Sequence, residues 1–183
     1  MTAIAGLKSS CDRSYKATYH GGTRPLNTIL WLVLHDTEGS TAQGAAAYFA
    51  SNEKTGSAHF CIDANRCYRT LDPDVIAYAA FSPANEKGLH FEQAGFARWT
   101  RQEWLTVGRG TIERTAYRVA YWGVQLGIPL RWLTDSQLRG EKVKGLTTHA
   151  QITRCFTGDH TDPGPNYPKD IFMARARYWA NNL

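Results

Sequence analysis

One apolar run constrains the fold more than any other segment of the chain. Residues 29–34 read Ile-Leu-Trp-Leu-Val-Leu, six bulky or β-branched residues with no polar residue among them. A run this short and continuously apolar is typical of a strand that is buried on both faces. The polar sequence from His35 to Gly39 follows at once. We therefore expect a central strand that ends in a loop carrying polar groups.

Helix and strand patterns alternate irregularly along the rest of the chain. Helix starts are indicated at Ser40 or Thr41, at the capping-box pair Thr100 and Glu103, and at Pro168. Strands are expected at residues 59–63, 67–71, 77–80 and 88–93, the first two paired across a turn. The apolar positions after Glu103 recur at helical spacing as far as Val124, although Gly108 and Gly110 weaken the first half of that helix. These patterns predict an α/β fold, a mixed central β-sheet flanked by helices.

Length and composition fit a single domain. The chain has 183 residues, 43% of them hydrophobic and 20% charged, which is enough to bury a substantial core. Residues 1–25, rich in Ser, Thr, Gly and Tyr, are expected to form an arm or loop before a domain of residues 26–183. No apolar run approaches the length of a membrane span, and the first ten residues lack the apolar core of a secretory signal. The net charge of +5 suits anionic partners and is equally ordinary for a basic soluble protein.

The four cysteines do not form a recognisable framework. They stand at positions 11, 61, 67 and 155, and no two are spaced as Cys-x-x-Cys. Cys61 and Cys67 flank a turn, so they could lie near each other across two strands. Four cysteines in a chain of this length are not a disulfide scaffold, and we expect them to be reduced and partly buried.

Two histidines and one carboxylate are candidates for a metal site. His35 follows the apolar strand, His149 ends the run Gly145-Leu146-Thr147-Thr148, and Asp162 precedes Pro-Gly-Pro. Three such ligands close three corners of a tetrahedral Zn²⁺ site and leave the fourth open for water, as in catalytic zinc sites. The combination predicts one zinc ion per chain and metal-assisted amide hydrolysis.

Four blocks, in the same order, resemble the zinc-dependent N-acetylmuramoyl-L-alanine amidases, which share a fold with the peptidoglycan recognition proteins. They are Val33–Gly39, Gly56–Phe60 with Tyr68, Asn85 with Gly88–Glu92, and Thr148-His149 with Asp162-Pro163-Gly164-Pro165. The blocks cover most of the chain. The Asp-Pro-Gly-Pro ending and Glu92-Gln93-Ala94-Gly95 look especially like endolysins of actinobacterial phages.

The resemblance implies roles for the catalytic groups. Glu92 matches the glutamate that acts as general base beside the zinc. His160 stands where better-known relatives have a lysine that stabilises the oxyanion, and an imidazole can donate the same hydrogen bond. Relatives often use cysteine as the third ligand; Cys155 falls seven residues too early, which favours Asp162.

Three further polar residues belong to the matching blocks. His59 and Asn85 are our candidates for substrate binding, and His59 matches a position near the cleft, although for His59 we favour a hydrogen-bonded structural role over that alternative. His90 lies two residues from Glu92 on the same strand, so the two side chains share a face. For His90 we expect exposure to solvent or a place behind the metal ligands.

The resemblance implies hydrolysis of the amide bond between N-acetylmuramic acid and L-alanine in peptidoglycan. We expect a monomer, made in the host cytoplasm and acting at the bacterial cell wall, with no nucleic-acid partner and no membrane insertion. A non-catalytic peptidoglycan-binding module of the same fold is the alternative, although such modules typically lose the third ligand. A cysteine peptidase is disfavoured because Cys61 and Cys67 lie on predicted strands rather than at the start of a helix.

Overall fold

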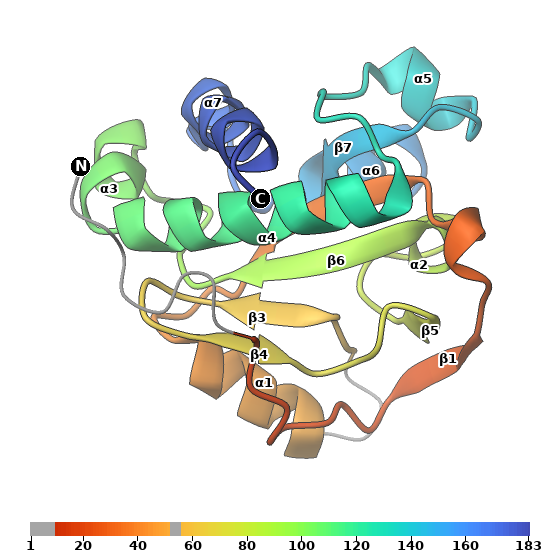
Figure 1. Cartoon of the computed structure of the whole chain (residues 1–183), viewed down its shortest axis with the longest axis horizontal. Coiled ribbons are helices and arrows are strands. Elements are labelled where there is room, and N and C mark those ends of the chain that lie inside the picture. Colours follow the sequence, from red (N-terminus) through yellow and green to blue (C-terminus); the bar gives the residue numbers. More distant parts are fainter. Residues whose placement is uncertain (1–9, 52–55) are drawn as a thin grey trace.

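The computed structural model describes residues 10–51 and 56–183, and its centre is a five-stranded mixed sheet (Figure 1). The strand order is β4 (Cys67–Arg69), β3 (Phe60–Ile62), β6 (Gly88–Gln93), β2 (Trp31–Asp36) and β7 (Gly145–Thr148). β3, β6, β2 and β7 run parallel to one another, and the edge strand β4 pairs antiparallel with β3. Most of the apolar run therefore lies in a central strand, β2, which begins at Trp31, is paired on both sides and is buried along its whole length. The predicted α/β fold is confirmed.

The two faces of the sheet differ in chemistry because side chains alternate along each strand. One face is apolar: Leu32 and Leu34 of β2 and Leu89 and Phe91 of β6 pack in a cluster with residues of two long helices. These are α4 (Arg109–Leu126) and α7 (Lys169–Ala180), which lie beside each other over the sheet in Figure 1.

The opposite face carries the polar groups. β2 and β6 are in register, with His35 opposite Glu92 and Val33 opposite His90, so these four side chains point the same way. The elements packed near this face are shorter: α1 (Ala42–Ser51), α2 (Ala84–Lys87) and α6 (His149–Cys155). A site built on this face sits on a rigid sheet whose other face is covered by the main apolar core.

Helix starts follow the predicted caps. Thr41, not Ser40, caps α1, accepting a hydrogen bond from the Gly44 N–H at 3.1 Å. The Thr100–Glu103 capping box is present at α3 (Arg101–Thr106). The single helix predicted from this capping box to Val124 is in fact two helices, α3 and α4, because the chain turns at residues 107–108. A further short helix, α5 (Asp135–Arg139), was not predicted.

The segment before the domain contains structure that the sequence did not indicate. β1 (His20–Thr23) pairs antiparallel with β5 (Val75–Ala77), which is the strand expected slightly later, at 77–80. A 3-10 turn, Leu26–Thr28, then leads to β2. Residues 1–9 of the expected arm lie outside the described residues, and the division at residue 25 stays a prediction.

The prediction of four reduced cysteines is wrong for one pair. Cys11 and Cys67 form a disulfide across a sequence separation of 56 residues. The arm lies against β4, since the Asp12 N–H donates to the Cys67 carbonyl and the Arg69 N–H donates to the Asp12 carbonyl, both at 2.8 Å. Cys61 and Cys67 do not bond to each other, although they flank the same turn. Cys61 is paired with Tyr68 in the β3–β4 register, which puts the Cys61 and Cys67 side chains on opposite faces of the sheet. Cys61 and Cys155 are free and buried.

None of the helices in the two described segments combines the length and apolar character that crossing a bilayer requires.

Candidate active site

The three predicted metal ligands converge at one edge of the sheet. His35 lies near the end of β2, and His149 follows directly on the neighbouring parallel strand β7 as the first residue of α6. Asp162 comes from the loop after α6, held there by a hydrogen bond from the Ala150 N–H to its carbonyl at 2.9 Å. One ligand atom from each residue lies within 4.8 Å of the others.

The distances between these atoms suit a tetrahedral ion. His35 Nδ1 lies 3.1 Å from His149 Nδ1 and 3.3 Å from Asp162 Oδ2, and His149 Nδ1 lies 3.1 Å from Asp162 Oδ1. Ligand bonds of 2.0–2.2 Å at tetrahedral angles place ligand atoms about 3.3–3.6 Å apart. The observed spacing is close to that of a zinc site with three protein ligands.

The electrostatics of the cluster also fit a cation. His35, His149 and Asp162 are all buried, and Asp162 Oδ2 has no hydrogen-bond donor. A buried carboxylate oxygen without a donor is costly unless a positive charge compensates it. Burial lowers the pKa of His35 to about 4, so its imidazole is neutral at neutral pH and can offer a lone pair.

Glu92 stands next to this cluster. Its Oε1 lies 3.9 Å from His35 Nδ1, and its side chain is almost fully buried. Burial, together with the charges of Asp162 and Asp36, raises the pKa of Glu92 well above its ordinary value. A buried carboxyl group with a perturbed pKa beside such a cluster is a candidate for proton transfer.

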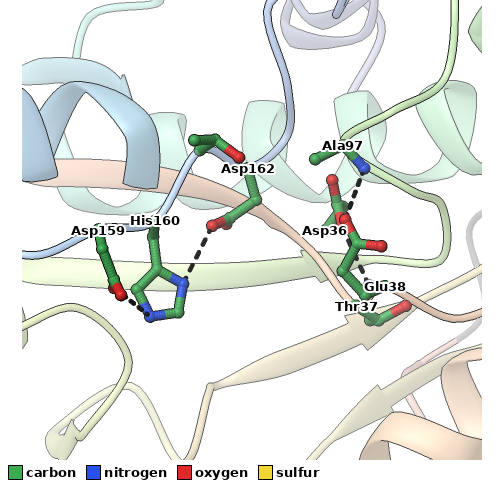
Figure 2. Close-up of a pocket in the computed structure, with 8 residues that line it drawn as sticks. Asp36, Thr37, Glu38, Ala97, Asp159, His160 and Asp162 are labelled. Carbon is green, nitrogen blue, oxygen red and sulfur yellow. Dashed lines mark hydrogen bonds and ion pairs between the residues drawn. The ribbon is translucent and has the colours of Figure 1, made fainter.

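His160 borders the cleft that leads to the cluster. Its ring stacks on His149 with centroids 4.1 Å apart, and Nδ1 lies 3.5 Å from Asp162 Oδ1. The side chain is 53% exposed, unlike those of the three ligands. Figure 2 shows His160 and Asp159 on one side of Asp162, with Asp36, Glu38 and Ala97 on the other. The cleft has a volume of about 460 Å³ and is lined by Asp36, Thr37, Glu38, Ala97, Asp159, His160, Thr161 and Asp162.

The two predicted substrate-binding residues do not line this cleft. His59 is fully buried; its Nδ1 accepts a hydrogen bond from the His90 N–H at 3.1 Å, and its Nε2 lies 2.9 Å from the Val75 carbonyl. Both ring nitrogens are engaged, so the position of His59 supports the structural alternative and not contact with substrate. Asn85 accepts hydrogen bonds from the N–H groups of Ala79 and Ala80 through Oδ1. A substrate contact by Asn85 stays a prediction.

Sequence reasoning gave no role to two residues that support the site. Asp36 lines the cleft, and burial raises its pKa to about 7. Gln93 donates a hydrogen bond to the His35 carbonyl at 3.1 Å and accepts one from Tyr167 at 2.7 Å, which fixes the end of β2. Asp36 directly follows His35 and Gln93 directly follows Glu92, and this adjacency to a predicted site residue is the sequence signal that could have indicated their roles.

Comparisons with known proteins agree with the fold. The structure matches Staphylococcus aureus hydrolase AmiA in complex with its ligand, with a TM-score of 0.70 and 16% identity, covering 94% of this chain and 86% of that one. It also matches the N-acetylmuramoyl-L-alanine amidase LysC from Clostridium intestinale, with a TM-score of 0.58 and 14% identity over 91% and 96% of the two chains. A mutant endolysin from Bacillus subtilis gives a TM-score of 0.57 at 13% identity, over 91% and 98%. No curated protein sequence is significantly similar to the chain.

The mixed sheet with a buried His-His-Asp cluster at its edge defines a hydrolase-like α/β domain. Residues 25–165 match the profile of the N-acetylmuramoyl-L-alanine amidases, which is most of the chain. The chain belongs to this family, and its activity is that of a peptidoglycan amidase.

Proposed function

We propose that the protein uses zinc to hydrolyse the amide bond between the lactyl group of N-acetylmuramic acid and L-alanine. The observation that carries this proposal is the buried cluster of His35 Nδ1, His149 Nδ1 and the Asp162 carboxylate beside the cleft. The donor set fits zinc, since two imidazole nitrogens and one carboxylate with an open fourth position are typical of catalytic zinc.

His35, His149 and Asp162 would hold the ion beside the cleft, which Asp162 lines. Zinc bound there would supply a Lewis acid that polarises the scissile carbonyl and activates water. Glu92 takes a proton from the attacking water as the new C–O bond forms. When the C–N bond breaks, Glu92 returns that proton to the leaving L-alanine nitrogen. His160 donates a hydrogen bond to the oxyanion that develops on the carbonyl oxygen.

The biological setting is part of the same proposal. Two proteins of similar fold are named as endolysins, one from Bacillus subtilis and one from Clostridium intestinale. We infer a phage endolysin that acts on its own as a monomer, is made in the host cytoplasm and cuts the wall peptidoglycan. Asp162 Oδ2 and Glu92 Oε1 lie 3.3 and 3.9 Å from His35 Nδ1, and this proximity favours catalysis over a module that only binds peptidoglycan.

The decisive test is the chemistry of the product. Purified cell walls digested with the protein should release stem peptides with new N-terminal L-alanine, identified by mass spectrometry. The glycan strands should stay uncut. New reducing sugar ends, or cleavage within the stem peptide, would show a different bond specificity, and intact walls in the presence of added zinc would favour the binding module.

His160→Ala is expected to lower turnover by roughly 10²-fold, the usual cost of losing one oxyanion donor. Zinc content should stay at the wild-type level, because His160 is half exposed and lies outside the three-ligand cluster. His160→Lys should recover part of the activity, since lysine also donates to an oxyanion. The measurements are kcat on purified walls and zinc per chain by elemental analysis. Loss of zinc in His160→Ala would make His160 a ligand instead.

A further inference from the structure

A third histidine lies behind the metal cluster. His90 of β6 is fully buried, and its Nδ1 lies 3.0 Å from Nε2 of His35, the nitrogen that points away from the cluster. On the other side of the ring, His90 Nε2 lies 3.0 Å from the Ala84 carbonyl oxygen. The three groups form a line from the backbone of α2 to a metal ligand.

The chemistry of these groups determines where the protons lie. A carbonyl oxygen only accepts, so the Nε2–H of His90 donates to Ala84. Complete burial favours the neutral ring, and a neutral imidazole has one N–H, which leaves His90 Nδ1 as an acceptor. The donor at 3.0 Å from this acceptor must then be the Nε2–H of His35. The second nitrogen of His35, Nδ1, is therefore unprotonated and turns its lone pair toward His149 and Asp162.

The His90 ring is fixed from several sides. A Cβ on Gly88 would lie 2.6 Å from the Ala84 oxygen and 2.7 Å from His90 Nε2, so only glycine permits this hydrogen bond. The backbone N–H of His90 donates to His59 Nδ1 at 3.1 Å, and the two imidazole rings stack at an interplanar angle of 7°. The contacts with Ala84, Gly88 and His59 thus hold the His90 ring in the orientation that turns Nδ1 toward His35.

We propose that His90 is a positioning residue that holds His35 in the tautomer with Nδ1 free to bind zinc. The inference rests on the proposed zinc site. Groups that orient a ligating histidine through its second nitrogen are typically worth 10–100-fold in metal affinity.

Two substitutions separate the hydrogen bond from the packing. His90→Phe keeps an aromatic ring but removes the acceptor, and it should weaken zinc binding about 10–100-fold in competition with a chromophoric chelator. His90→Asn can place an amide oxygen near the former Nδ1 position, so it should bind zinc more tightly than His90→Phe. The Ala84 oxygen keeps a donor in both variants, because it also accepts from the Gly88 N–H. His20→Phe, at an exposed position on β1, is the matched control and should leave zinc affinity unchanged.

Nuclear magnetic resonance tests the tautomer directly. Long-range ¹H–¹⁵N spectra of the zinc-free wild type should show His35 protonated at Nε2 and unprotonated at Nδ1. In zinc-free His90→Phe the two tautomers of His35 should be mixed. A wild-type His35 protonated at Nδ1 overturns the inference, as does a folded His90→Phe that binds zinc with wild-type affinity. If the wild type binds no zinc, the proposed function fails, while the spectra still decide the tautomer.

Discussion

Replacing Glu92 with glutamine is expected to reduce turnover on purified cell walls by roughly 10²–10⁴-fold, the usual worth of a positioned acid–base group. Glu92 lies on β6 in register with His35, with its Oε1 3.9 Å from His35 Nδ1. Glutamine has nearly the same shape, so the buried position stays filled. An amide cannot take the proton of the attacking water, so the loss should fall on kcat.

The control for this substitution is Glu86→Gln, which makes the same chemical change at an exposed position on α2. It should keep full activity. Zinc content and thermal stability of Glu92→Gln should equal those of the wild type, measured by elemental analysis and thermal unfolding. Near-wild-type hydrolysis by a folded, zinc-loaded Glu92→Gln would show that another group moves the proton.

His149→Ala is expected to remove both bound zinc and hydrolysis. The substitution deletes one of three ligand atoms, leaving His35 Nδ1 and the Asp162 carboxylate. Two protein ligands hold zinc poorly, and without the ion the pKa of the attacking water returns from about 7 toward 15.7. The measurements are zinc per chain by elemental analysis and release of N-terminal L-alanine from walls.

The wild type provides the reference for this prediction. It should contain one zinc per chain, lose activity in a strong chelator and regain it when zinc is restored. Stoichiometric zinc in His149→Ala would mean that the ligand set is wrong. A wild type that is free of metal, and active in chelator, would refute the zinc mechanism.

The sequence predicted the parts of the site that depend on strand ends. The continuous apolar run from Ile29 predicted a strand buried on both faces with His35 directly after it, and His149 was expected at the end of the run Gly145-Leu146-Thr147-Thr148. The two histidines were expected to meet as ligands of one metal ion, and they lie together at the edge where the parallel strands β2 and β7 end. Glu92 and His90 were placed on one face by strand alternation alone, which the register confirms.

Other features depend on contacts that leave no local pattern. The Cys11–Cys67 disulfide and the β1–β5 pair join segments more than 50 residues apart. The spacing of apolar residues within a segment does not predict which distant segment it pairs with. The burial of His59 was equally hidden, because it follows from Val75 and the His90 backbone closing around the ring. These features depend on packing between distant segments, whereas the strands and helix caps could be predicted from local sequence patterns.

The disulfide gives the enzyme a different stability in each compartment it would pass through. Thiols stay reduced in a bacterial cytoplasm, so a chain made there would carry Cys11 and Cys67 unlinked. A bond that closes a loop of 56 residues typically adds about 2–4 kcal/mol to the free energy of unfolding. On the proposed route the arm would be locked to β4 only after release into an oxidising exterior. The protein would then be more durable where it meets the wall than where it is stored, and a cell that keeps its contents reducing would hold it in the weaker form.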